Sequence, residues 1–214
     1  MAIIRSIIFT GASQKIGEVV LQKWKDETIA RKKPSHVSNP KTQKQEFQRA
    51  RVKIYNLLYQ RSPFELKAGF KEISKKITEW NSFFRENTKS QFLSNTNEYV
   101  FSNYITAKGS LKETPLKTLS ITGSDLKIEW DTTAVENQKA TDYLIAISYE
   151  YDSTNKKIVQ SITDLNTVTR ADGSKTLTFK TTPTTGNVAW VFWSFSSADN
   201  KKQSNNEVNN VNIT

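Results

Sequence analysis

The sequence of 214 residues contains no cysteine and a single histidine, His36. Without cysteine, disulfide scaffolds, thiolate zinc sites, iron–sulfur centres and cysteine nucleophiles are excluded. The lone histidine has no second histidine with which to form a metal site, and it lies in a polar stretch between Pro34 and Pro40 that favours a loop. A histidine in such a loop is more often a surface residue than a catalyst. We therefore expect no metal and no other cofactor.

Long apolar runs are also missing. No stretch approaches the ~20 apolar residues that span a bilayer, and Arg5 interrupts the apolar start at residues 1–9, so we read no secretion signal there. We therefore expect no membrane span and a location in the cytoplasm or in a virion. The content of 36% hydrophobic and 11% aromatic residues is enough to form a core, which excludes a fully disordered chain.

Acidic residues are scarce in the first part of the chain. Residues 1–90 hold 19 Lys and Arg against 8 Asp and Glu, residues 91–114 hold 2 against 2, and residues 115–214 hold 10 against 11. The formal net charge of +10 therefore comes from the first part alone. Such asymmetry predicts two modules with different surroundings, one facing an anionic surface and the other facing water or protein. A solvated lysine face is the alternative interpretation.

The first module begins with a predicted β-hairpin and continues with a basic helix. Residues 17–24 and 28–33 favour two strands around a tight turn. Asn39 and Pro40 then suit a helix start, because proline lacks an N–H that this position leaves unpaired anyway. The apolar residues of this helix recur at spacings of three and four: Phe47, Ala50, Ile54, Leu57 and Leu58.

A second helix is predicted from Ser62, where Ser62 and Glu65 form a capping-box pattern with Pro63 at the first helical position. Its apolar residues alternate spacings of four and three: Leu66, Phe70, Ile73, Ile77, Trp80 and Phe84. Two such helices joined by a few residues predict an antiparallel helical hairpin. A further strand is predicted at residues 99–106.

The second module follows a predicted linker at residues 111–117 and is all β. Its apolar pattern has period two, with Gly, Asn, Asp and Pro turns between segments. The strands are expected at residues 119–122, 125–130, 142–151, 157–162, 175–181, 188–196 and 207–213. Seven strands in about a hundred residues, with Trp130 on an early strand, are typical of an immunoglobulin or fibronectin type III sandwich, and the lack of cysteine favours the latter.

The predicted fold class is therefore α+β, with three parts. A basic N-terminal module occupies residues 1–110, a linker residues 111–117, and an immunoglobulin/fibronectin III-like β-sandwich residues 118–214. On one strand of the sandwich, Trp190 and Trp193 fall on opposite faces because three residues separate them. One is expected in the core, and the other either packs inside as well or forms an exposed aromatic contact patch with Phe192 or Phe195.

Two short motifs resemble those of short-chain dehydrogenases. Residues 7–17 resemble the Thr-Gly-x-x-x-Gly-x-Gly turn, and Tyr104 and Lys108 have the Tyr-x-x-x-Lys spacing. However, Lys15 stands where that turn needs its middle glycine, and no series of βαβ units separates the motifs. Three carboxylates also lie close in sequence without any sign of a shared cleft: Asp125, Glu129 and Asp131. We therefore expect a protein that is not an enzyme.

The basic residues of the first module are the candidate site. They have the charge and reach to neutralise several phosphates, and equally suit a solvated or protein-facing surface. The tryptophan among them is either a stacking residue or the core anchor of the hairpin. The candidate anion- or partner-binding residues are Lys23, Trp24, Arg31, Lys32, Lys33, Lys41, Lys44, Arg49, Arg51 and Lys53.

Several short pieces together resemble an uncharacterised family of short proteins from Bacteroidota-type bacteria and their mobile elements. The pieces include Gly17-x-Val19-Val20 leading to Trp24-Lys25, Asn39-Pro40-Lys41-Thr42-x-x-Gln45, Gln48-Arg49-Ala50, Gly69-Phe70, Lys108-Gly109-Ser110-Leu111 and Ala140-Thr141-Asp142. The family usually has a glycine near positions 13–14, where this chain carries Ser13 and Gln14. The resemblance implies the fold and brings no catalytic residues.

A basic arm, a helical hairpin and a β-sandwich together resemble structural proteins of phage particles, in which immunoglobulin-like modules are frequent decorations. We therefore predict a structural or interaction protein, a subunit of a larger assembly such as a phage virion. The basic module would dock to protein neighbours in a homo- or hetero-oligomer, and the sandwich would present loops. The alternative is a nucleic-acid-binding protein that contacts phosphates through residues 1–90.

Overall fold

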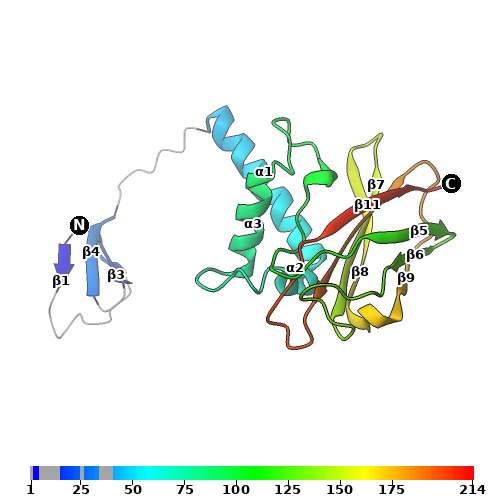
Figure 1. Ribbon diagram of the computed structural model, residues 1–214. Helices are drawn as coiled ribbons and strands as arrows, with labels where there is room; N and C mark the ends of the chain where they lie inside the picture. Colours follow the sequence, from blue (N-terminus) through cyan, green and yellow to red (C-terminus); the bar gives the residue numbers. More distant parts are fainter. Residues whose placement is uncertain (1, 5–14, 25–26, 34–40) are drawn as a thin grey trace. The chain divides into compact units, whose positions relative to one another are not determined.

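The computed structural model describes residues 2–4, 15–24, 27–33 and 41–214 (Figure 1). The chain forms two compact units, which we call the small unit (Met1–Gln43) and the large unit (Lys44–Thr214). The sequence analysis placed the division at residues 111–117 instead. The structure places it some seventy residues earlier, because the helices expected in the first module share a core with the β-sandwich. His36 and most of the dehydrogenase-like turn lie outside the described residues.

The small unit is an antiparallel sheet in the order β1-β4-β3-β2. Its strands are β1 (Ala2–Ile4), β2 (Lys15–Ile16), β3 (Val19–Trp24) and β4 (Glu27–Lys32). The predicted hairpin corresponds to β3 and β4, which pair from Val19 opposite Lys32 to Trp24 opposite Glu27. Gly17 makes the turn between β2 and β3 with a φ of 57°, a left-handed conformation that glycine adopts without strain. The apolar N-terminal strand pairs with β4 of its own chain.

The helices of the large unit differ from the predicted hairpin of two helices. They are α1 (Gln43–Arg61), α2 (Pro63–Gly69) and α3 (Glu79–Lys89), with a short 3-10 helix η2 (Phe101–Asn103) further on. The second predicted helix therefore ends at Gly69 and resumes only at Glu79. A Cβ atom at Gly69 would overlap the carbonyl oxygen of Thr106 and lie 2.9 Å from the Cβ of Ala107. Helix α2 therefore ends where another segment packs closely against it. The Thr78 hydroxyl caps α3 by accepting from the N–H of Asn81 at 3.3 Å.

The predicted capping box at the start of α2 is also absent. Ser62 makes no side-chain cap hydrogen bond, although Pro63 does occupy the first turn as expected. The Ser62 hydroxyl instead lies 3.4 Å from the Tyr149 hydroxyl, inside the core. Glu65 is buried. The Ser62 hydroxyl is therefore used in a tertiary contact and not in a helix cap.

The seven predicted strands of the second module are confirmed, with somewhat different ends. They are β5 (Leu116–Thr122), β6 (Asp125–Trp130), β7 (Tyr143–Asp152), β8 (Lys157–Thr169), β9 (Ser174–Thr178), β10 (Val188–Ser196) and β11 (Glu207–Asn212), with a 3-10 helix η3 (Arg170–Asp172) before β9. They form a three-stranded sheet, β5-β6-β9, and a four-stranded sheet, β11-β10-β7-β8, both antiparallel. Buried side chains of both sheets, including Leu126, Trp130, Val191 and Trp193, form the core between them.

A second core covers the other face of the four-stranded sheet. Side chains from the three helices meet Tyr149, Ile158 and Phe192 of the sheet there, so the large unit has three layers (Figure 1). Phe192 is fully buried, and the Trp190 ring stacks on Phe101 with 5.2 Å between centroids. The predicted exposed aromatic contact patch is therefore wrong, because the helices cover this face.

The strand predicted at residues 99–106 is also wrong. After η2, two asparagine side chains satisfy the backbone that a neighbouring strand would otherwise pair. Asn87 of α3 donates to the carbonyl of Ile105 at 2.8 Å and accepts from its N–H at 2.9 Å. Asn206 accepts from the N–H of Thr106 at 2.9 Å and donates to the carbonyl of Tyr104 at 3.1 Å. The segment is thus held between α3 and the start of β11.

Residues 111–117 are packed into the large unit and do not form a linker. The N–H of Leu111 donates to the carbonyl of Gln203 at 2.8 Å. The carbonyl of Thr114 accepts from the indole N–H of Trp193 at 3.0 Å, and β5 already begins at Leu116. Pro115 and the polar composition therefore mark an irregular segment that packs against the large unit and leads directly into β5.

Candidate functional site

The predicted basic residues of the small unit lie at the end of β4. Arg31, Lys32 and Lys33 are all exposed, and Arg31 and Lys32 point to opposite faces because they are adjacent in a strand. The ammonium of Lys32 lies 3.6 Å from the carboxylate of Glu18, but both groups are exposed. An exposed pair of this kind contributes little to stability. These cations are therefore available to a partner.

Two further predicted residues, Lys23 and Trp24, lie at the end of β3. Their backbones pair with Thr28 and Glu27. Their side chains lie outside the part of the chain that the structure describes, so the stacking role of Trp24 remains a prediction.

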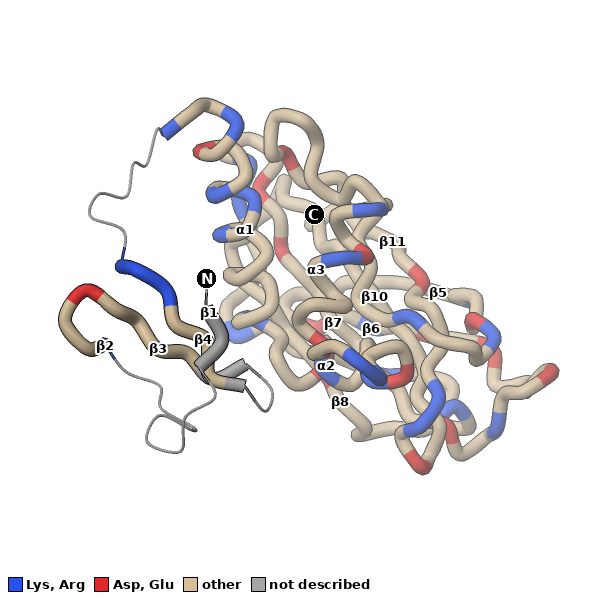
Figure 2. The backbone as a smooth tube through the Cα atoms, turned by 90° about the vertical axis from the view of Figure 1, so that its left-hand side faces the viewer, with Lys and Arg blue, Asp and Glu red and all other residues tan. Residues whose placement is uncertain are grey.

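The predicted basic residues of α1 fall into two groups. Lys44, Arg49 and Lys53 are exposed, as is Lys41 just before the helix, and Figure 2 shows Lys and Arg positions gathered along α1. Arg51 is different. Its guanidinium donates to the carbonyls of Leu93 at 3.3 Å and Ser94 at 3.2 Å. It therefore holds α1 to the segment after α3, and a role for Arg51 in binding an anion remains a prediction.

The ten predicted residues belong to both units. Residues Lys23 to Lys41 lie in the small unit and Lys44 to Lys53 in the large unit. Each group is exposed within its own unit, apart from Arg51 and the two side chains that are not described. A single continuous basic surface across both groups remains a prediction.

The side chains of Tyr104 and Lys108 both have structural partners: Tyr104 is buried, and Lys108 pairs with Glu86. Tyr104 is buried in the second core, and burial beside Tyr149 raises its pKa well above the ordinary value of 10.0. A proton donor of the dehydrogenase type needs a lowered pKa instead. Lys108 donates to Glu86 at 2.6 Å. The geometry therefore opposes a catalytic role for this pair.

Glu86 is the centre of a cluster of cations on α3. Burial raises the pKa of this carboxyl, but the hydrogen bonds from Lys108 and Arg85 outweigh burial and lower its pKa below the ordinary 4.5. Arg85 donates at 2.9 Å, and the ammonium of Lys89 lies 3.8 Å away. The cluster fixes an ionised carboxylate between α3 and the segment of residues 104–108 that follows η2, which we call the extended segment.

The three carboxylates near β6 do not share a site. Asp125 accepts from the hydroxyl of Thr178 at 2.6 Å, Glu129 pairs with Lys127 at 2.7 Å, and Asp131 accepts from the N–H of Thr133 at 2.9 Å. These hydrogen bonds lower the pKa of Glu129 and of Asp131. Each carboxylate is therefore used locally. Among the described residues no group of three His, Cys, Asp or Glu side chains is placed to hold a metal.

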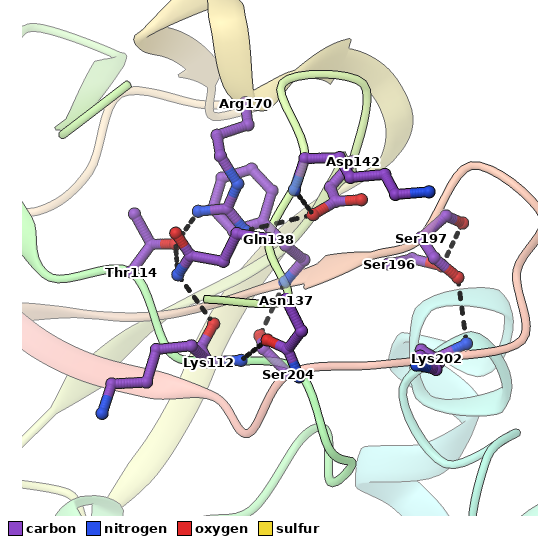
Figure 3. A network of polar contacts seen from close by, with 12 residues as sticks. Lys112, Thr114, Asn137, Gln138, Asp142, Arg170, Ser196, Ser197, Lys202 and Ser204 are labelled. Carbon is purple, nitrogen blue, oxygen red and sulfur yellow. Dashed lines mark hydrogen bonds and ion pairs between the residues drawn. The ribbon is translucent and has the colours of Figure 1, made fainter. Parts of the chain in front are cut away.

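A buried polar network closes one end of the sandwich and was missed by the sequence analysis (Figure 3). The fully buried Arg170 lies 3.6 Å from the carboxylate of Asp142, and its guanidinium sits 4.1 Å from the centroid of the Phe195 ring. It also donates to the hydroxyl of Thr114. Burial lowers the pKa of Arg170, and the ion pair with Asp142 opposes that shift. The sequence indicates this pair only through the positions of Arg170, directly after β8, and of Asp142, directly before β7.

Gln138 joins the network to the chain segment before β5. Its amide donates to the carbonyls of Lys112 and Glu113, both at 3.0 Å. The N–H of Lys139 donates to Asp142 at 2.8 Å. The partners of the network are backbone groups and internal side chains, so this arrangement supports stability rather than binding.

A cavity of about 320 Å³ opens beside the extended segment of the large unit. Serine and asparagine side chains line much of it, and Lys108 is its only charged lining residue. Since Lys108 is already paired with Glu86, the cavity offers no free charge to a ligand.

In the described part of the chain, no helix is long and apolar enough to cross a membrane.

Comparisons with known proteins give a family and several distantly similar structures. A protein family described as being of unknown function, DUF6266, matches residues 11–209. No curated protein matches the chain. A solved human fibronectin type III domain, from fibronectin type III domain containing protein 3, matches 50% of this chain and 87% of its own, at 13% identity and a TM-score of 0.32.

Proposed function

Because this chain belongs to the family of unknown function DUF6266, its activity has to be inferred from its geometry, and we propose a non-enzymatic structural or interaction protein. In this proposal the protein is a subunit of a larger assembly. The large unit is its stable body, and the small basic unit docks it to protein neighbours.

The observation that carries the proposal is the surface of the small unit. Residues 1–43 hold eight Lys and Arg against three Asp and Glu. The described strands expose the cations of β4 together with two apolar side chains, Ile16 at 55% and Val19 at 40%. A unit of about forty residues is near the lower limit for a domain that is stable without support. A small sheet with exposed apolar and basic side chains fits a surface that binds a partner.

The non-enzymatic part of the proposal is supported by how the reactive side chains are used. Tyr104 is buried with a raised pKa, Lys108 is paired, and the carboxylates near β6 each have a separate partner. A virion is the kind of assembly that we favour, on the fold-level analogy with phage structural proteins.

Sedimentation velocity over a range of concentrations tests the docking role. We expect the full chain to associate beyond its monomer mass of 24.4 kDa, and the triple variant Arg31→Gln/Lys32→Gln/Lys33→Gln to associate at least tenfold more weakly. The matched control Lys117→Gln/Lys139→Gln/Lys180→Gln removes the same charge from exposed positions of the large unit. Association that both triple variants weaken equally, or a chain that stays monomeric throughout, contradicts docking through the small unit by self-association.

A second candidate function is nucleic-acid binding through the basic part of the chain. Three consecutive exposed cations, Arg31, Lys32 and Lys33, support it, with Lys44 and Lys53 exposed on α1. Phosphate contacts give affinities that fall steeply with salt. Binding to single- and double-stranded DNA across a salt series is therefore the test, for the full chain and for residues 44–214. A slope of several units that decreases without the small unit supports phosphate contact, and flat, weak binding by both excludes it.

A further inference from the structure

We infer that an exposed row on the large unit, formed by Phe64, Lys67 and Lys71, binds single-stranded nucleic acid together with Lys75 and Lys76, which are exposed in the segment that follows. We call these five residues the α2 lysine face. It lies in a different unit from the docking surface proposed above. The inference rests on the second candidate function, nucleic-acid binding, and gives it a specific surface and a specific class of partner.

The first three residues of the α2 lysine face form one row. Phe64 and Lys67 lie on α2, and the turn that continues the helix carries Lys71, whose N–H donates to the carbonyl of Ala68 at 3.2 Å. Spacings of three and four residues place them on the same side of the helix. With a rise of about 1.5 Å per residue, successive members are about 4.5 and 6 Å apart along the axis. Lys75 and Lys76 follow before α3.

The positive charge of this face is not compensated locally. All four lysines are exposed, and within the described residues none of them forms an ion pair. The acidic residues of the same segment are used elsewhere. Glu65 is buried, and the carboxylate of Glu72 accepts from the backbone N–H groups of Ser110 at 3.1 Å and Gln203 at 2.7 Å. Because neither Glu65 nor Glu72 neutralises these lysines, the four exposed ammonium groups give the segment a net positive surface charge.

The exposed ring of Phe64 favours single-stranded over double-stranded nucleic acid as the ligand. Its side chain is 71% exposed, more than any other large hydrophobic residue in the described part of the chain. Unpaired bases can stack on an exposed aromatic ring, whereas bases inside a duplex cannot. Lysines supply phosphate contacts that are independent of base sequence. An aromatic ring beside a row of lysines is therefore suited to a single strand.

An anionic membrane is a poorer fit. Helices that lie in a membrane surface present a broad apolar face to the lipid. The α2 helix has only seven residues, and Leu66 and Phe70 point into the second core. A single exposed ring thus remains for contact.

The test measures binding of the full chain to a fluorescein-labelled 20-nucleotide oligo(dT) by polarisation at several salt concentrations. Each phosphate contact on a single strand contributes about 0.7 to the slope of log affinity against log salt. We therefore expect the variant Lys67→Gln/Lys71→Gln/Lys75→Gln/Lys76→Gln to lower the slope by about 3. Phe64→Ala should weaken binding about tenfold through lost stacking, and Phe64→Tyr should retain it.

The matched control is Lys117→Gln/Lys139→Gln/Lys157→Gln/Lys180→Gln, which removes the same charge from exposed positions of the sandwich. It should keep the slope of the unmodified chain. Thermal unfolding checks that each variant is folded. Equal loss in the control, or no binding of the oligonucleotide by the full chain, overturns the inference. Binding only to phosphatidylserine vesicles also overturns the inference. If only Arg31→Gln/Lys32→Gln/Lys33→Gln loses oligonucleotide binding, the contact lies on the small unit and the inference is wrong.

Discussion

Arg170 shows how a single residue is stabilised in a place that normally excludes its charge. Its side chain is fully buried at the end of the sandwich, where Asp142 supplies the opposite charge and the Phe195 ring lies under the guanidinium. Removing one partner from a buried ion pair leaves the other charge without compensation, which costs far more than the pair contributes as a whole. The stability of this end of the sandwich therefore depends on keeping the two charges together.

Arg170→Met should lower the free energy of unfolding by about 3 to 5 kcal/mol, because it leaves the Asp142 carboxylate buried without its cation. Urea unfolding followed by tryptophan fluorescence measures the change. Adding Asp142→Asn in the same chain should restore part of the loss, since no buried charge then remains. The exposed control Lys180→Met should change stability by less than about 0.5 kcal/mol. If Arg170→Met is as stable as the unmodified protein, the ion pair of Arg170 and Asp142 does not stabilise this end of the sandwich.

Glu86 predicts how stability depends on pH. Its pKa in the folded protein lies below the ordinary 4.5, because Lys108 and Arg85 favour the ionised form. A depressed pKa contributes stability that is present above the unfolded value and is lost as the pH falls through the folded value. Glu86→Gln should therefore reduce the difference in unfolding free energy between pH 7 and pH 3. In the exposed control Glu136→Gln that difference should be unchanged.

At the scale of elements, the break between α2 and α3 is the clearest case in which tertiary packing overrides a local pattern. Spacings of four and three run from Leu66 to Phe84 without interruption and predict one helix. The chain instead leaves the helix at Gly69, where the backbone of the segment at Thr106 and Ala107 comes too close for a side chain. Periodicity reports which side chains are apolar, and it does not report where another segment will cross.

Gly69→Ala tests this account. The added methyl group would overlap the Thr106 carbonyl, so either α2 or the crossing segment must move, and we expect a loss of about 3 kcal/mol in unfolding free energy. Asn56→Ala, at an exposed position of α1, should be neutral or slightly stabilising, since alanine has the higher helix propensity. Equal stability of Gly69→Ala and the unmodified chain would show that the close approach of residues 106–107 does not require glycine here.

At the scale of the whole molecule, the large unit contains the two hydrophobic cores that the structure describes. Both cores of the large unit are made from residues after position 53, in the part of the chain that the structure describes. The helices close one core over the four-stranded sheet, so a sandwich without helices would expose Tyr149, Phe192 and Ile158. The unit that folds cooperatively is therefore helices and sandwich together.

Two truncations check this division. Residues 44–214 should unfold in one transition, with an unfolding free energy close to that of the large unit in the full chain. Residues 111–214, the predicted linker and sandwich together, should aggregate or unfold without cooperativity, because one face of their sheet is apolar and uncovered. Heat-induced unfolding by calorimetry distinguishes the two fragments. A stable, soluble fragment 111–214 would contradict the three-layer arrangement.

The sequence by itself determined the local elements: the hairpin of β3 and β4, helix α1 and the seven strands from β5 to β11. These depend on alternation, helical spacing and turn residues, which act over a few neighbouring positions. The tertiary structure alone decided the break after Gly69, the packed segment before β5, the covered face around Phe192 and the burial of Arg170. Each of these depends on segments far apart in the chain meeting in space, and no periodicity within either segment encodes that meeting.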